Sequence, residues 1–278
     1  MNSASFIASI FLYAATLLYA AAGILSWRKL MDESVSAQNK LTSLLMLLIA
    51  SAVLLHGLHI VILWLSHGIN FGLSQSASLV IFFITLLLWV IALYRPIVSL
   101  ATLVMPTAAI ILAVTLIWSG PAYLPKGNRL LFNTHWVVAL SGFAMIALAV
   151  AQALLLAKQE SSLRQRHTNK LLGSLPPIMT MDRLLFQFIT SGFILLSITL
   201  ITGIFFSHSL FGKAFVFNHH VILSIGAWLI FAILLTGRRL AGWRGNTAVR
   251  WTLGGFLVLA LGYFGSKFVL EILLQRPG

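Results

Sequence analysis

The stretch from residue 175 to residue 245 decides the fold of this chain, and it reads LPPIMTMDRLLFQFITSGFILLSITLITGIFFSHSLFGKAFVFNHHVILSIGAWLIFAILLTGRRLAGWRG. It contains two apolar runs joined by a short loop rich in phenylalanine and histidine, and it closes with a basic cluster. These features comprise Phe211, Phe215, Phe217, His208, His219, His220, Arg238, Arg239 and Arg244. Each run is long enough to cross a bilayer, so the histidines and the arginines must lie on opposite faces of a membrane. We expect the loop to carry part of the function.

The composition identifies the chain as a membrane protein. Hydrophobic residues make up 60% of it and charged residues 8%, whereas about a quarter of the residues in a soluble globular chain are charged. The net charge of +13 does not indicate nucleic-acid binding, because the basic residues lie in short loops between apolar runs rather than on one soluble face. The absence of cysteine excludes disulfides, thiolate metal sites and covalent haem attachment. A metal or haem would therefore need histidine or weaker ligands.

Apolar stretches of spanning length occur at eight places, roughly residues 5–26, 41–66, 72–94, 97–118, 132–157, 184–207, 217–236 and 251–273. Only helices fit, because backbone groups inside lipid must find their partners within the segment. We find no internal repeat. The sequence predicts an all-α, polytopic transmembrane helical bundle that forms one integral membrane domain over residues 1–278.

The distribution of lysine and arginine predicts the orientation. Arg28 and Lys29 follow the first apolar run instead of preceding it, so this run is an uncleaved span with its N-terminus outside. The inner loops then carry thirteen basic residues, which are Arg28, Lys29, Lys40, Arg95, Lys158, Arg164, Arg166, Lys170, Arg183, Arg238, Arg239, Arg244 and Arg250. The outer segments carry four, which are Lys126, Arg129, Lys213 and Arg276. This asymmetry places both termini in the periplasm.

The histidines gather on one side in this topology. At the outer ends of spans lie His67, His135, His208, His219 and His220, and in the outer half of the second span lie His56 and His59. Only His167 falls in an inner loop. Histidine within a span is costly and usually faces a partner, a cavity or a ligand.

His56 and His59 are three residues apart and share one helical face. Neither could therefore serve opposite sides of one haem iron with the other, and a haem ligand on this face would need a partner from another helix. The alternative is that both histidines form hydrogen bonds between helices. The sequence leaves these two interpretations about equally open.

Two other candidates lie at the outer edge. His135 stands beside Trp136, and the pair could be an interfacial anchor. Lys267 and Glu271 are four residues apart in the last span and could neutralise one another, or Lys267 could meet an anionic group such as a haem propionate. Glu271 is the only acidic residue in a span, which argues against a cation transporter or a carboxylate proton relay.

Several motifs in fixed order resemble the cytochrome c assembly family over about residues 70–272. They are the Leu-Pro before Asp182-Arg183-Leu184, Gly203, Trp228, the turn Gly242-Trp243-Arg244-Gly245, and the segment Gly262 to Gly265. The length and the eight spans look most like the YpjD-like and HemX-like inner-membrane branch. The family includes haem-handling members in which a tryptophan-rich periplasmic segment cradles haem between histidines.

The resemblance implies a bacterial inner (plasma) membrane protein that binds or handles haem at its periplasmic side and is linked to cytochrome c assembly. His135 matches the histidine upstream of the haem segment. Residues 211–220, FGKAFVFNHH, lack the tryptophans, and no histidine follows them near the end of the chain. We expect a non-covalent haem b without catalysis, ligated by His135 and by His208, His59 or His56, with Lys267 near the propionates.

The expected partners are haem, membrane lipid and other cytochrome assembly proteins, and nucleic acid is not expected. Two further interpretations stay open. The chain could be a non-haem membrane scaffold or regulatory assembly partner whose histidines are interfacial. It could also be a b-type electron carrier, for which only His56 and His59 lie deep enough in the bilayer.

Overall fold

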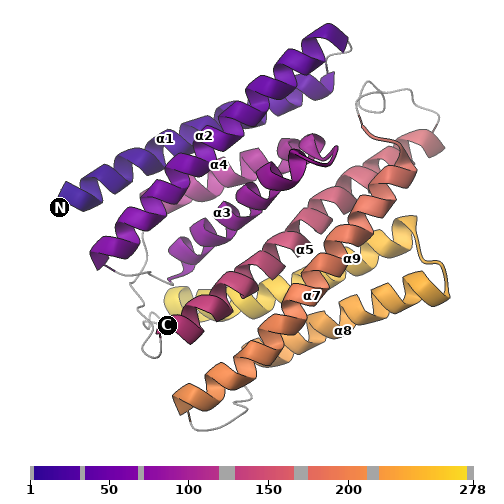
Figure 1. Ribbon diagram of the computed structural model, residues 1–278. Helices are drawn as coiled ribbons and strands as arrows, with labels where there is room; N and C mark the ends of the chain where they lie inside the picture. Colours follow the sequence, from indigo (N-terminus) through magenta and orange to yellow (C-terminus); the bar gives the residue numbers. More distant parts are fainter. Residues whose placement is uncertain are drawn as a thin grey trace. The chain divides into compact units, whose positions relative to one another are not determined.

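The computed structural model describes residues 3–31, 35–67, 72–118, 129–165, 175–211 and 219–273 (Figure 1). All the regular structure in these ranges is helical, and the ranges contain 8 helices that are long and apolar enough to cross a membrane. The predictions of an all-α fold and of eight spans are confirmed. The periplasmic location of the two termini stays a prediction.

The helices fall into two compact units, which are described separately. Unit 1 comprises residues 1–124 and 159–177, and unit 2 comprises residues 125–158 and 178–278. The single integral membrane domain expected from the sequence stays a prediction. The elements of unit 1 are α1 (Ser3–Met31), α2 (Val35–His67), α3 (Leu73–Ala92), η1 (Val98–Leu100) and α4 (Ala101–Ile117).

Unit 1 is held together by close helix packing around small residues. A Cβ atom on Gly23 of α1 would lie 3.0 Å from the ring of Pro106 in α4, so only glycine allows these helices to approach so closely. Around this contact lies an apolar core with Leu45, Ile49, Leu88 and Leu112 fully buried. Such small-residue contacts are typical of membrane bundles, where van der Waals packing replaces the hydrophobic effect between helices.

Unit 2 contains most of α5 (Arg129–Arg164), then α7 (Ile178–Phe211), α8 (His219–Leu240) and α9 (Gly245–Ala260). The last span continues from α9 through η2 (Leu261–Gly265), α10 (Ser266–Phe268) and η3 (Val269–Leu273), and η2 and η3 are π-helical. Glycines again allow close contact. A Cβ on Gly142 of α5 would meet Leu195 of α7 at 3.1 Å, and a Cβ on Gly255 of α9 would meet Phe231 of α8 at 2.8 Å.

An ion pair ties α7 to the end of α8. Asp182 accepts a hydrogen bond from Arg238 at 2.6 Å, and Arg238 also donates to the Trp243 carbonyl at 3.0 Å. The Arg238 guanidinium lies 4.3 Å from the ring centre of Phe186, in cation–π contact. We call Asp182, Arg238 and Trp243 the inner clasp, because the predicted topology places them on the cytoplasmic side.

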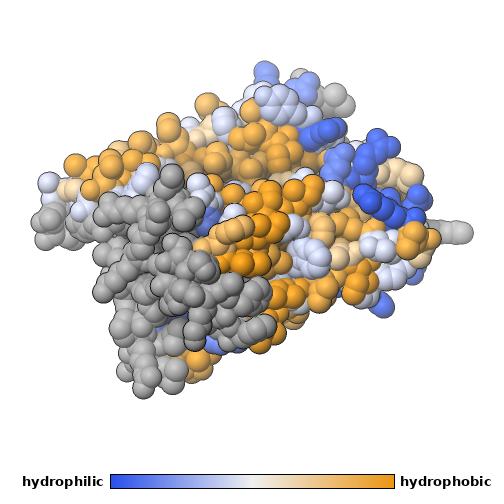
Figure 2. All heavy atoms as spheres, turned by 60° about the horizontal axis from the view of Figure 1, so that its bottom comes forward, coloured by the Kyte–Doolittle hydropathy of each residue, from blue (hydrophilic) through white to orange (hydrophobic). Residues whose placement is uncertain are grey.

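The surfaces of the spans suit a bilayer. Many large apolar side chains on them are exposed, among them Leu17, Leu47, Leu54, Ile110, Ile201 and Leu257. In water such a surface would drive aggregation, whereas in a membrane it meets acyl chains. Figure 2 shows this surface as a run of hydrophobic, orange residues, with hydrophilic residues gathered at the right-hand end.

Candidate functional site

His135 lies near the start of α5 with its ring orientation fixed by α7. Its Nδ1 is 2.9 Å from the Thr202 hydroxyl, which is also 2.9 Å from the Ile198 carbonyl. A hydroxyl has one hydrogen, which Thr202 donates to a carbonyl of its own helix, so it accepts the Nδ1–H of His135. This tautomer leaves the lone pair on Nε2. A histidine oriented in this way is typical of metal ligands.

Other polar groups come to the same end of unit 2. His220 interacts electrostatically with His135, His219 and Lys267. The four residues come from α5, α8 and α10, and we call them the outer cluster. His219 and His220 are exposed. The cluster therefore offers imidazoles and one ammonium group to a ligand at the surface.

Lys267 has both of the surroundings that the sequence suggested. It interacts electrostatically with Glu271, and its Nζ lies 5.4 Å from the ring centre of Tyr263. Tyr263 in turn lies 5.9 Å, centroid to centroid, from Phe143 of α5, which also packs on Phe264. The aromatic packing fixes the π-helical segment that presents Lys267.

Three of the histidines discussed in the sequence analysis cannot be described at the side-chain level. His208 lies in the last turns of α7 and His67 ends α2, but their side chains fall outside the described part of the structure. His167 lies outside the described residues altogether. The structure therefore leaves His208 as a candidate ligand by its position alone.

His56 is fully buried in unit 1, and both of its ring nitrogens have partners. Nε2 lies 2.9 Å from the Ser78 hydroxyl, and Nδ1 lies 3.5 Å from the Tyr19 hydroxyl. Tyr19 is also hydrogen-bonded to Thr85 at 2.9 Å. These contacts connect α1, α2 and α3 and favour the interhelical interpretation of His56. The sequence analysis missed Tyr19, whose signal was a polar-tipped aromatic inside an apolar span.

His59 differs from His56 in the state of its second nitrogen. Its Nδ1 donates to the Ala8 carbonyl at 2.8 Å. Its Nε2 is buried and has no hydrogen-bond partner among the described residues. A buried polar atom without a partner calls for an explanation, and a ligand or a water molecule is the usual one. Of the two histidines in α2, His59 thus has the nitrogen suited to a ligand.

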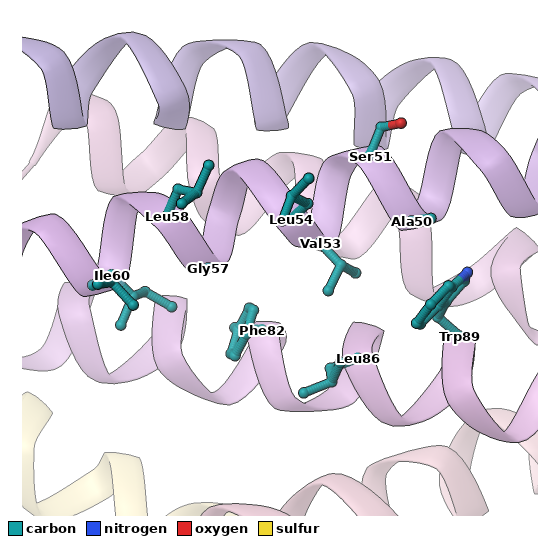
Figure 3. Close-up of a pocket in the computed structure, with 11 residues that line it drawn as sticks. Ala50, Ser51, Val53, Leu54, Gly57, Leu58, Ile60, Phe82, Leu86 and Trp89 are labelled. Carbon is teal, nitrogen blue, oxygen red and sulfur yellow. The ribbon is translucent and has the colours of Figure 1, made fainter.

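An apolar groove of about 630 Å³ runs between α2 and α3 (Figure 3). Val53, Leu54, Gly57 and Leu58 line it from α2, and Phe82, Leu86 and Trp89 from α3. The Phe82 ring also meets the His56 ring edge-on, with the centroids 5.4 Å apart. Phe82 therefore separates the groove from the buried hydrogen bonds of His56.

The donor set consists of single imidazoles rather than a multidentate cage. Within the ranges that the structure describes, no group of three or more histidine or acidic side chains could hold a metal ion. Axial ligation of a cofactor iron needs only one or two imidazoles. His135 and His59 each offer one such nitrogen with its tautomer fixed.

Comparison with known proteins places these residues in a family context. The family described as cytochrome C assembly protein matches residues 9–274. The inner membrane protein YpjD of Escherichia coli K12 is 34% identical over 142 residues, which are 50% of this chain and 52% of the relative. A 28.8 kDa protein of Azospirillum brasilense is 28% identical over 162 residues, or 58% of this chain and 60% of the relative.

A relative named for its function is also similar. The cytochrome c biogenesis protein CcsA of Prochlorococcus marinus NATL1A is 28% identical over 117 residues, which are 40% of this chain and 37% of the relative. The chain thus spans about half the length of the first relative and less than two thirds of the others. The eight apolar spans and the relative named for the inner membrane confirm the expected multi-pass, inner-membrane location.

Proposed function

We propose, from the premise that this chain belongs to the cytochrome c assembly family, that it holds haem at the outer cluster of unit 2 and takes part in cytochrome c assembly. The haem is bound without covalent attachment, as haem b, because the chain has no cysteine. The chain holds and positions the haem and catalyses no reaction of its own. Its partners are other proteins of cytochrome assembly.

The observation that carries this proposal is the fixed tautomer of His135. The Thr202 hydroxyl accepts from Nδ1, so that Nε2 presents its lone pair (2.9 Å between Nδ1 and Oγ1). Haem, when bound, supplies an iron that takes imidazole as an axial ligand. The residues present therefore fit the group. Thr202 acts as a positioning residue, because it orients the ligand without touching the haem.

The other members of the outer cluster suit the rest of the haem. Its two propionates are anionic, and the Lys267 ammonium is the cation of the cluster. The exposed imidazoles of His219 and His220 provide further hydrogen-bond donors at the surface. Lys267 therefore holds a propionate, while His135 provides the axial nitrogen.

The second axial ligand belongs to one of the remaining histidines. His59 has a buried nitrogen without a partner in the described residues, whereas both nitrogens of His56 are engaged. On this chemistry we prefer His59 to His56 as the ligand from the second span. His208 stays the alternative because of its position at the end of α7.

The test is haem titration of the purified protein in detergent, followed by absorption spectroscopy. We expect a low-spin spectrum in the wild type and its loss in His135→Ala. Thr202→Val should weaken haem binding by about 10- to 100-fold, because it removes the group that orients the ligand. Thr199→Val is the matched control, because the Thr199 hydroxyl bonds only to Leu195 of its own helix and should leave affinity unchanged.

Two results would overturn the proposal. The first is a folded His135→Ala protein that keeps the wild-type spectrum and affinity. The second is a wild type that binds no haem under any reducing or oxidising condition. Either result would favour the non-haem scaffold or regulatory partner.

A further inference from the structure

Four exposed arginines gather at the inner end of unit 2, around the inner clasp. They are Arg183, Arg239, Arg244 and Arg250, and we call them the arginine face. The clasp shows that they are neighbours. Asp182 bonds to Arg238, which places the start of α7 against the end of α8, and Arg238 bonds to the Trp243 carbonyl, which holds the following turn.

The turn between α8 and α9 is built tightly. Gly242 and Gly245 have φ angles of 65° and 53°, in a region that favours glycine. The Trp243 ring packs against Gly237 and stacks on Trp251, with the ring centroids 5.4 Å apart. These contacts keep the arginines on both sides of the turn close to one another.

The charge of the arginine face is not cancelled within the described residues. Asp182 is the acidic residue at this end, and it is buried and already paired with Arg238. None of the four exposed arginines forms an ion pair within those residues. The face therefore presents several positive charges to whatever adjoins it.

The surroundings of the face indicate what adjoins it. Leu240 and Met179 lie beside the arginines in sequence, and their side chains are 84% and 63% exposed. In a bilayer such residues meet acyl chains, so the arginines next to them lie at the depth of the lipid headgroups. In Figure 2 the hydrophilic residues gather at the right-hand end, the end at which Figure 1 has α8 give way to α9.

We propose that the arginine face binds the phosphate of an anionic phospholipid. A guanidinium group is a planar fork of donors that matches phosphate oxygens in pairs, which the point charge of a lysine does not. All four positions carry arginine, although either basic residue would satisfy a topology signal. The lipid would bridge the start of α7 and the α8–α9 turn. This inference is independent of haem binding.

The test measures lipid retention by native mass spectrometry. The protein is extracted from vesicles that contain equal amounts of phosphatidylglycerol and phosphatidylcholine. We expect the wild type to retain phosphatidylglycerol preferentially. Arg244→Gln should lower this retention about fivefold, and joint substitution of Arg239, Arg244 and Arg250 by Gln should lower it at least about tenfold. Arg95→Gln is the control, since Arg95 is exposed in unit 1 at the same predicted membrane face.

Removal of three inner charges could prevent correct insertion, so a second variant keeps them. Joint substitution of Arg239, Arg244 and Arg250 by Lys preserves the topology signal and removes the forks. We expect this variant to insert as the wild type does and to retain several-fold less phosphatidylglycerol. The proposal fails if the wild type shows no preference between the lipids. It also fails if both triple variants keep the wild-type retention, in which case the face suits a protein partner.

Discussion

The inner clasp should be one of the most sensitive points of the structure. The Asp182 side chain is 10% exposed and that of Arg238 25%, so the pair is largely removed from solvent. Arg238→Met removes the guanidinium and keeps much of its apolar stem. The carboxylate of Asp182 then stays buried without its partner.

The expected loss follows from the contacts of Arg238. Removal of one partner from a buried ion pair costs about 3–5 kcal/mol, because an uncompensated charge is left behind. The lost hydrogen bond to the Trp243 carbonyl and the lost cation–π contact with Phe186 lie within that total, since such terms are not additive. Asp182→Asn should cost less, about 1–3 kcal/mol, because Arg238 keeps its carbonyl partner and can reach the lipid headgroups.

The measurement is equilibrium unfolding in mixed micelles of increasing denaturing detergent, followed by tryptophan fluorescence. Trp243 and Trp251 are stacked beside the clasp, so the signal also reports on this region. The matched control is Arg239→Met, which removes the neighbouring arginine. Arg239 is exposed and unpaired among the described residues, so its loss should change stability by less than about 0.5 kcal/mol.

A double-mutant cycle makes the reasoning refutable. The combined variant of Asp182→Asn and Arg238→Met should be more stable than the sum of the single effects predicts, by about 0.5–3 kcal/mol. Strictly additive effects would show that the two side chains do not interact. Equal stability of Arg238→Met and Arg239→Met would show that the clasp contributes nothing beyond a surface charge.

Further predictions concern the interior and the topology. Tyr19→Phe removes the buried hydroxyl that bonds to Thr85 at 2.9 Å and should lower stability by about 0.6–1.7 kcal/mol in the same assay; no loss would contradict this contact. Gly255→Ala should cost about 1–3 kcal/mol, since its Cβ would lie 2.8 Å from Phe231. Its neighbour Gly254 has nothing within 4 Å, so Gly254→Ala should be neutral or stabilising by up to about 1 kcal/mol; equal effects would refute the packing argument. A reporter fused after the last residue should be periplasmic, and cytoplasmic activity would overturn the topology.

The sequence predicted the spans well because hydrophobic length is a local property. A run of about 20 apolar residues specifies a spanning helix without knowledge of its neighbours. The same locality explains why His56 and His59 could not be distinguished. Their different roles depend on Ser78 and Ala8, which stand 22 and 51 residues away and reach them only through the packing of helices.

The candidate site shows the same limit. The sequence singled out His135 through the family resemblance and placed its partner on depth alone. It did not bring His220 and Lys267 to His135, because that proximity depends on how α5, α8 and α10 pack. Likewise, the sequence drew attention to Asp182 and to the arginines near residue 240 as separate motifs, and only the packing of α7 on α8 joins them.

The π-helical segments η2 and η3 give the last span an unusual tolerance for changes of length. A π-turn contains one residue more than an α-turn, and the extra residue rotates everything beyond it by about 100°. Deletion of one residue from η2 would restore an α-helix and turn Lys267 and Glu271 together to another side, while α9 keeps its packing. In a plain α-helix the same deletion would displace every later contact. The end of this span can therefore be re-aimed by one codon, which gives evolution and the protein engineer a rotary adjustment of its polar groups.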